Sequence, residues 1–219
     1  MLSARDVYKH FATPAGTLEV LRGIDLEVAP GETVAVLGES GSGKSTLLAL
    51  LAGLDVPTRG SVCIDGHDTS ALSERDLAAL RARSVGIVFQ SFHLMGGLSA
   101  EENVRLPLEL RGDADAHARA RAALAQVGLA ARAEHLPARL SGGECQRVAI
   151  ARALVVEPGI LLADEPSGSL DERTGEAVDD LLFELVARRG TALVLVTHSE
   201  RLAARCQRRV RLTGGRLAA

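Results

Sequence analysis

The stretch Thr33–Ala52, TVAVLGESGSGKSTLLALLA, decides the fold of this 219-residue chain. The apolar run Thr33–Leu37 is typical of a buried strand, and Lys44–Ala52 is typical of a helix. The loop between them matches the pattern GxxxxGK[ST]. Its glycines free the backbone to wrap around phosphate groups, and the helix N-terminus offers unpaired N–H groups to the same anion. The stretch therefore predicts an α/β domain that binds a phosphorylated ligand.

Lysine is rare in this chain, and one lysine stands inside the loop. Lys9 and Lys44 are the only lysines among 25 Lys and Arg residues. A compact ammonium fits a tight backbone cradle better than a planar guanidinium does. We expect Lys44 to reach the β- and γ-phosphates and Ser45 to ligate Mg²⁺. The expected phosphate-binding residues are Gly38, Glu39, Ser40, Gly41, Ser42, Gly43, Lys44, Ser45 and Thr46.

A second glycine-rich helix start lies at Leu140–Leu154, LSGGECQRVAIARAL. Gly142 and Gly143 precede an apolar-periodic run, so Ser141 is the expected N-cap. Such a terminus carries a partial positive charge and free N–H groups, and the glycines would let an anion approach. Taken alone, the stretch could equally be an ordinary capped helix, because Ser-Gly-Gly is common in turns.

Strand patterns alternate with helix patterns along the chain, which predicts a mainly parallel sheet covered on both faces. The expected strands are Leu18–Val28, Thr33–Leu37, Ser61–Asp65, Val85–Phe89, Ile160–Ala163, Thr191–Thr197 and Arg209–Thr213. The expected helices are Lys44–Ala52, Ser73–Arg81, Ser99–Leu110, Asp113–Gln126 and Asp171–Arg188, besides the run after Ser141. Residues 91–158 are rich in helix patterns. We therefore expect one domain, 1–219, with a core lobe of about 1–90 and 159–219 and a helical lobe of about 91–158.

Two carboxylates end the apolar run Ile160–Ala163. A strand that runs to the carboxyl edge of a parallel sheet would deliver Asp164 and Glu165 beside the phosphate loop. Adjacent strand residues point to opposite faces, so the two acids could serve different roles. The alternative is a pair of solvated acids at a strand end.

In this order and spacing, the motifs resemble those of the ATP-binding cassette (ABC) ATPases over essentially the whole chain. The resemblance implies a P-loop NTPase (RecA-like) core, an antiparallel β subdomain and an inserted α-helical subdomain. Among ABC proteins the chain is most similar to the MacB, LolD and FtsE group. VGIVFQSFHL and ENVRLPLELRG look most like the YbbA-type branch.

The resemblance implies ATP hydrolysis with Mg²⁺ and assigns roles to residues beyond the loop. Gln90 follows a predicted strand and would sense Mg²⁺ and the attacking water. Glu165 would orient and deprotonate that water, and His198 would contact the γ-phosphate. The implied catalytic residues are Lys44, Gln90, Glu165 and His198, and the implied Mg²⁺ residues are Ser45, Gln90 and Asp164.

The resemblance also implies a dimer, because the family's signature motif binds the nucleotide held by a second copy. The signature residues here are Ser141, Gly142, Gly143 and Glu144. Asp171 lies in the segment that resembles the family's D-loop, which crosses the dimer interface. Phe11 aligns with the aromatic residue that stacks on adenine, and Tyr8 is a nearby rival.

The implied partner is an integral-membrane permease of MacB or FtsX type, with export, lipoprotein release or mechanotransmission as the function. The longest apolar run is only Leu47–Ala52, too short for a membrane span. We therefore expect a cytoplasmic chain, peripheral on the inner face of the membrane through its partner. A net charge of −3 gives no sign of nucleic-acid binding.

Some residues depart from the group's pattern. Cys145 stands where Gln is usual, and Ser167 and Ser169 replace Thr and Asn. Met95–Gly97 replaces a Pro-Thr pair in the segment that should face the membrane subunit, which bears on partner identity. The three cysteines lack the spacing of a zinc site or a disulfide framework.

Other functions are compatible with part of these motifs. A regulatory or mechanical ATPase could gate a periplasmic partner without moving a substrate. An ABC protein of DNA maintenance would carry long heptad insertions, and a ribosomal one would carry two cassettes, neither of which occurs here. A small-molecule kinase with a phosphate loop would leave Leu140–Glu144 and His198 unexplained.

Overall fold

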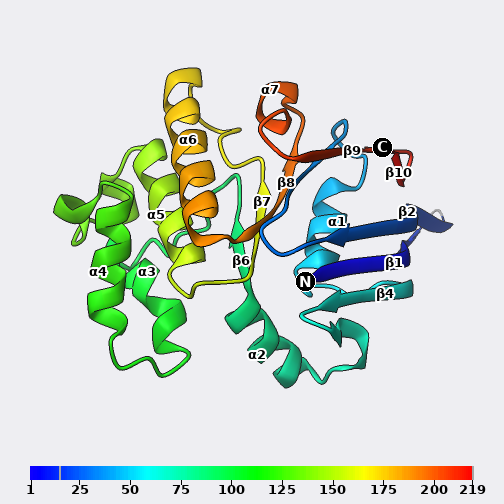
Figure 1. Ribbon diagram of the computed structural model, residues 1–219, viewed down its shortest axis with the longest axis horizontal. Helices are drawn as coiled ribbons and strands as arrows, with labels where there is room; N and C mark the ends of the chain where they lie inside the picture. The colour runs from blue at the N-terminus through cyan, green and yellow to red at the C-terminus, as the bar shows by residue number, and fades with distance from the viewer. Residues whose placement is uncertain (15, 219) are drawn as a thin grey trace.

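The computed structural model describes residues 1–14 and 16–218, and the strands within them form two sheets (Figure 1). In this part of the chain the larger sheet has six strands, in the order β10-β9-β3-β8-β7-β6. Neighbouring strands are parallel except for the last hairpin, so the predicted mainly parallel sheet is confirmed. The strands are β3 (Thr33–Leu37), β6 (Val85–Val88), β7 (Ile160–Asp164), β8 (Ala192–Thr197), β9 (Arg208–Thr213) and β10 (Arg216–Ala218).

The smaller sheet is antiparallel, as the family resemblance implied. Its order is β2-β1-β4-β5 among the residues that the structure describes. The strands are β1 (Leu2–Thr13), β2 (Gly16–Val28), β4 (Arg59–Ile64) and β5 (His67–Asp68). Helix α1 (Lys44–Leu51) contacts strands of both sheets and so lies between them (Figure 1).

Both faces of the parallel sheet are buried, and alternate residues of one strand enter different cores. On β3, Ala35 and Leu37 belong to the core shared with the helical region, whereas Val34 and Val36 belong to the core around α1. This explains the uninterrupted apolar run, because a strand covered on both faces has no solvent side.

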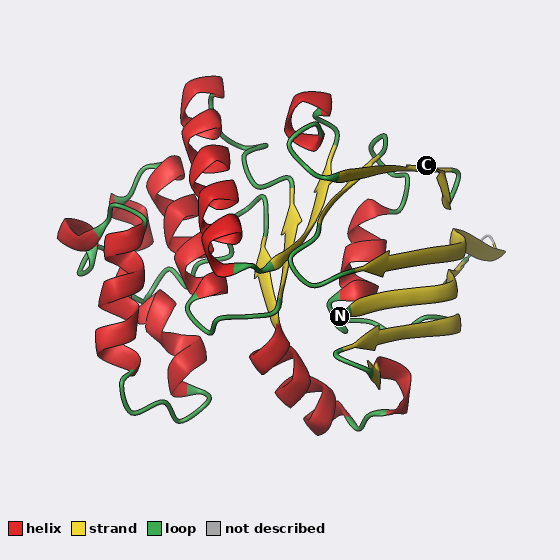
Figure 2. Cartoon of the chain, viewed as in Figure 1, coloured by secondary structure: helices red, strands yellow, loops and turns green. Residues whose placement is uncertain are grey.

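Helices gather at the end of the molecule opposite the antiparallel sheet (Figure 2). They are α3 (Ala100–Glu109), α4 (Ala116–Gln126), α5 (Gly142–Leu154) and α6 (Glu172–Arg189). The shorter helices are α2 (Glu74–Ser84), α7 (Glu200–Ala203) and the 3₁₀ turns Thr69–Ala71, Ala130–Arg132 and Pro137–Arg139. Within the described residues, no helix combines the length and apolar character needed to cross a bilayer.

Strand β1 is the largest element that the sequence did not predict. Its register against β2 shifts between Ala4 and Val7 and twice more before His10. Asp6, at the first shift, has a left-handed backbone with φ of 47°. Each irregularity exchanges the faces to which side chains point, so the apolar alternation that marks a strand is lost.

Several predicted boundaries were wrong by a few residues. Helix α4 begins at Ala116 rather than Asp113, because the Asp113 carboxylate accepts the Asp115 N–H at 2.9 Å and forms a turn before the helix. Helix α2 continues to Ser84 instead of ending at Arg81. Helix α6 begins after Asp171, whose carboxylate caps it by accepting the Thr174 N–H.

Candidate nucleotide site

The phosphate loop joins β3 to α1 at the carboxyl edge of the parallel sheet. Gly41 and Gly43 have φ of 78° and 100°, a region that other residues adopt only with strain. At Gly38 a β-carbon would lie 2.6 Å from Ser42 Oγ and 2.7 Å from the Leu212 carbonyl oxygen. Glycine is therefore required at Gly38 for packing and at the other two positions for backbone conformation.

Lys44 lies folded over the loop. Its Nζ donates to the carbonyl oxygens of Gly38 at 2.7 Å and Glu39 at 2.8 Å. Ser42 Oγ is buried and has no hydrogen-bond partner. A glycine-rich loop with an ammonium at two of its carbonyl oxygens and an unpaired buried hydroxyl fits a bound phosphate chain.

Strands β6, β7 and β8 end at the same edge and bring four further side chains to the loop. Together with the loop they surround a cavity of about 810 Å³. The lining residues are Val20, Glu39, Ser40, Gly41, Gly43, Lys44, Ser45, Thr46, Gln90, Asp164, Glu165 and His198. The carboxyl edge of the parallel sheet thus brings together side chains that lie more than a hundred residues apart in the sequence.

The Ser45 hydroxyl and the Asp164 carboxylate converge, with Ser45 Oγ donating to Asp164 Oδ2 at 3.0 Å. Burial raises the pKa of the Asp164 carboxyl, and the neighbouring Glu165 raises it further. A cation bound here would lower it again. Among the described residues there is no group of three or more His, Cys, Asp and Glu side chains that could hold a metal. The Ser45 hydroxyl and the Asp164 carboxylate are hard oxygen ligands, and such a small set suits Mg²⁺, which keeps waters and phosphate oxygens in its shell.

Glu165 has a strained backbone and a tightly held side chain. Its φ is 45°, and its N–H donates to the Val196 carbonyl oxygen at 2.9 Å. Oε1 accepts the His198 N–H at 2.8 Å and lies 2.7 Å from His198 Nδ1, while Oε2 accepts from Thr197 Oγ1 at 3.0 Å. The carboxylate is therefore held in place at the cavity by three donors.

Thr197 is a residue that the sequence interpretation passed over as part of a strand. Its hydroxyl both donates to Glu165 and accepts the Ser199 N–H at 3.0 Å. Its place directly before His198 was the available signal.

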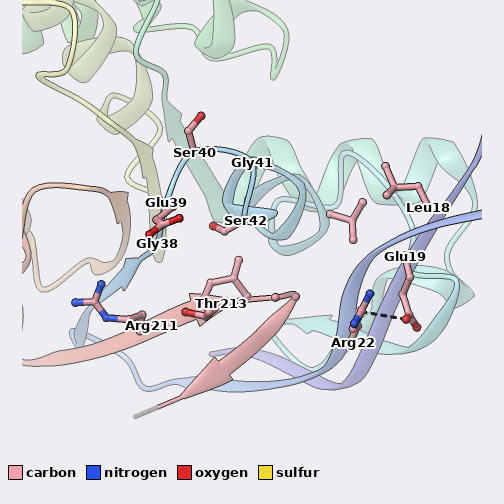
Figure 3. A pocket seen from close by; sticks show the side chains of 14 residues that line it. Leu18, Glu19, Arg22, Gly38, Glu39, Ser40, Gly41, Ser42, Arg211 and Thr213 are labelled. Carbon is pink, nitrogen blue, oxygen red and sulfur yellow. Dashed lines mark ion pairs between the residues drawn. The ribbon is translucent and has the colours of Figure 1, made fainter.

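A second cavity, of about 500 Å³, lies on the other side of the loop, between it and strands β2 and β9 (Figure 3). Gly38 and Ser42 line this cavity and not the first one. Val20 lines both cavities, and no sequence pattern had marked it as a site residue. Leu18, which pairs with Phe11 across β1 and β2, also lines the second cavity.

The two candidate adenine-stacking residues lie on β1, and neither lines either cavity. Phe11 is 40% exposed, and its ring lies 5.1 Å from Lys9 Nζ. Tyr8 faces Arg59, whose guanidinium lies 5.2 Å from its ring centroid. Phe11 is therefore the more accessible of the two.

The signature segment does not reach the cavity of its own chain. Ser141 Oγ accepts the Glu144 N–H at 3.2 Å, and Glu144 Oε2 accepts the Ser141 N–H at 2.8 Å, which makes a capping box at the start of α5. A β-carbon on Gly143 would lie 2.4 Å from Thr174 Cγ2, so glycine is needed for the packing of α5 on α6. Asp171 also lies outside the cavity, at the N-cap of α6.

Comparisons with known proteins agree with this geometry. Residues 21–168 match the family described as ABC transporter. The chain is 54% identical over 91% of its length to an uncharacterised ABC transporter ATP-binding protein, YbbA, of Escherichia coli strain K12, covering 89% of that protein. It is 49% identical over 99% of its length to the lipoprotein-releasing system ATP-binding protein LolD of Alcanivorax borkumensis, covering 96% of it.

Solved structures are similar as well. The dimeric post-hydrolysis state of the ATP-binding cassette MJ0796, bound to ADP and Pi, superposes with a TM-score of 0.92 at 38% identity. All of this chain and 97% of that one are covered. A second dimeric structure of MJ0796 gives a TM-score of 0.92 at 39% identity.

Proposed function

This chain belongs to the ABC transporter family as an ATP-binding subunit with ATPase activity, and on that premise we propose that two copies close on two ATP molecules to drive a membrane permease. Each nucleotide would lie between Gly38–Thr46 of one copy and Ser141–Glu144 of the other. The observation that carries this proposal is the fixed Glu165 carboxylate, held by Thr197 and His198 at the cavity of the phosphate loop.

Catalysis in this proposal is charge neutralisation together with one general base. Lys44 leaves its two carbonyl partners to bind the β- and γ-phosphates, and the loop amides orient them. Ser45, Asp164 and Gln90 would hold Mg²⁺, which would supply positive charge to the phosphate oxygens. The Glu165 carboxylate takes a proton from the attacking water.

His198 completes the arrangement. Its side chain is 72% exposed, against 13% for Glu165, so much of its ring is open to a nucleotide while Nδ1 contacts Glu165. In the proposal it orients Glu165 through Nδ1 and presents the rest of its ring to the γ-phosphate.

The dimer is supported by the place of the signature segment. Ser141–Glu144 lies outside the cavity of its own chain, and a twofold axis lets one sequence supply both halves of each site. MJ0796 was solved as a dimer with a fold this similar. Phe11, exposed on β1 and paired with Leu18 of β2, is our candidate for stacking on adenine.

The proposed partner is an integral-membrane permease of MacB or FtsX type, which would hold the chain at the inner face of the membrane. Identity near 50% to both YbbA and a LolD supports a system of this group. Its work would be export, lipoprotein release or mechanotransmission. A regulatory ATPase that gates a periplasmic partner without transport remains the second candidate, and it shares the same nucleotide site.

Replacement of Glu165 by Gln tests the proposal. The variant keeps the shape of the side chain but removes the base, so hydrolysis should fall by about 10²–10⁴-fold. We expect size-exclusion chromatography to show a monomer that becomes a dimer with MgATP. A second substitution, Ser141→Arg, should abolish the shift by placing a bulky side chain where the partner's nucleotide would lie.

Two results would contradict the proposal. Normal hydrolysis by Glu165→Gln would remove Glu165 as the base. A dimer that forms equally well with Ser141→Arg would show that the signature segment does not contact the nucleotide of a second copy.

A further inference from the structure

The turn that follows Gln90 has an unusual backbone. Phe92 and His93 are consecutive non-glycine residues with φ of 59° and 48°. Each such residue costs free energy, and a pair persists only where other contacts hold it. Arg152, from helix α5, supplies those contacts: Nη2 donates to the Phe92 carbonyl oxygen at 2.9 Å and Nη1 to the His93 carbonyl oxygen at 2.6 Å.

The residues just before this turn are anchored in the same way. Gln146, six residues before Arg152 on α5 and fully buried, donates from Nε2 to the Phe89 carbonyl oxygen at 3.2 Å. Ser169 Oγ donates to the Gln90 carbonyl oxygen at 3.0 Å. The segment 89–93 is thus held by side chains from elsewhere in the fold, most of them from α5.

Arginine suits this position for a physical reason. The Arg152 side chain lies beside an apolar cavity of about 300 Å³, and burial lowers the pKa of its guanidinium. A partly buried cation is tolerated when its donors are satisfied. The planar guanidinium presents two N–H groups to two carbonyl oxygens at once, which a lysine ammonium on its flexible stem cannot reproduce.

Helix α5 therefore connects two functional elements. Its N-terminus carries the signature residues from Ser141, and Arg152 near its other end fixes the turn that follows Gln90, which lines the nucleotide cavity. We propose that Arg152 is a positioning residue that joins the Gln90 segment to the signature helix, so that the two move as one body. The inference rests on the proposed function, since Gln90 acts on nucleotide only if the cavity hydrolyses ATP.

The test compares Arg152→Ala and Arg152→Lys with a matched control, Arg119→Ala. Arg119 also donates to a backbone carbonyl oxygen, that of Val155 at the C-terminus of α5, but it lies away from segment 89–93. Four quantities are measured for each variant: kcat for ATP, KM for ATP, amide hydrogen exchange of residues 89–95, and the thermal midpoint.

We expect Arg152→Ala to lower kcat by about tenfold or more, because small misplacements of a positioned group cost up to about 10² in rate. Amide exchange in residues 89–95 should accelerate while the rest of the domain stays protected. Arg152→Lys, which can reach one carbonyl oxygen, should lie between Arg152→Ala and wild type both in kcat and in the amide exchange rate of residues 89–95. The control should keep the wild-type kcat and the wild-type exchange of that segment.

The inference is overturned if Arg152→Ala retains wild-type kcat and exchange, or if Arg119→Ala loses kcat equally at a similar thermal midpoint. If Arg152→Ala does not fold, the Lys variant decides through the same two readouts. A wild-type chain without ATPase activity would instead count against the proposed function, and the exchange data would still report whether Arg152 anchors the turn.

Discussion

Helices α1 and α5 both begin at glycine-rich segments, yet their N-termini are built differently. At α1 the N-cap is Gly43, with no side-chain cap and no acidic residue in the first turn. At α5 the N-cap is Ser141, and Glu144 closes a capping box with its carboxylate. The first terminus leaves its amides and its dipole to a ligand, whereas the second satisfies part of its donors from its own side chains.

The two termini therefore differ in how far each could bind an anion within a single chain. The α1 terminus, with Lys44 beside it, forms a complete cradle within one chain. The α5 terminus keeps only the Gly142 and Gly143 amides outside its capping box and lies away from the cavity. An anion that contacts the α5 terminus would therefore already be bound to another molecule. This agrees with a site shared between two copies of the chain.

Removal of the Lys44 ammonium from the α1 terminus should produce the largest change in the rate of ATP hydrolysis. We expect Lys44→Ala to reduce hydrolysis by about 10²–10³-fold, as loss of one charged donor at a developing charge does. Lys9→Ala is the matched control, because Lys9 lies on β1 and donates to Asp55 and Val56 in the segment between α1 and β4. A steady-state ATPase assay measures both. Equal activities would mean that the α1 terminus does not need its ammonium.

Mixing two inactive variants separates the two termini more sharply. Lys44→Ala damages the α1 side of a site and Ser141→Arg the α5 side. A mixed dimer then has one site with both defects and one intact site, so activity should return to about a quarter of wild type when pairing is random. Titration of one variant into the other in the ATPase assay measures it. No recovery would indicate that both termini serve the same chain's nucleotide.

The capping box predicts a pH dependence for the α5 terminus that α1 lacks. The backbone hydrogen bond from Ser141 lowers the pKa of Glu144 below its ordinary value of 4.5. The stabilisation is therefore fully present above the ordinary value and is lost as pH falls through the lowered one.

Glu144→Gln should accordingly lower the free energy of unfolding at neutral pH, and the difference from wild type should shrink on acidification. Urea titrations between pH 7 and pH 3 measure this, and we expect a difference of about 0.3–1 kcal/mol at neutral pH, because Gln can still accept the Ser141 N–H and only the charge near the helix N-terminus is lost. A difference that grows on acidification would contradict the assignment of charge to the capping box.

Cys145 should give the smallest effect. Its thiol is 7% exposed, and burial raises its pKa, with the Glu144 carboxylate raising it further. Thiol chemistry requires the thiolate, so alkylation at pH 7 should be slow compared with the half-buried Cys63. Cys145→Ala should leave hydrolysis unchanged and cost about 1 kcal/mol or less of stability. Mass spectrometry after iodoacetamide treatment measures the first expectation, and rapid loss of activity linked to Cys145 would refute it.

The comparison also shows where sequence patterns succeeded. Three features are local, in that residues close in sequence make the structure: the phosphate loop, the acidic strand end and the signature helix. The family resemblance and the fold class are confirmed. The lobe boundaries at 90 and 159 and the roles of the site residues stay predictions. Strand β1 was missed because its bulges destroy the alternation by which a strand is recognised.

Other features depended on contacts over long distances in the chain. Thr197 and Val20 joined the site only when strands β2 and β8 were brought to the loop. The paired positive φ angles of Phe92 and His93 have no local signal, because the carbonyl contacts from Arg152 that hold them come from the other end of helix α5.

The sequence by itself determined that a glycine loop with one lysine begins a helix after a buried strand, and that a capped glycine helix follows far downstream. These follow from backbone conformation and local hydrogen bonds. The sequence predicted Asp164 and Glu165 beside the loop and, through the family resemblance, Gln90 and His198 at the nucleotide. The folded chain brings all four side chains to one cavity and leaves Ser141–Glu144 outside it. The reason is that parallel strands align their carboxyl ends at one edge, and the order of strands in the sheet, set by packing of both faces, chooses which ends meet.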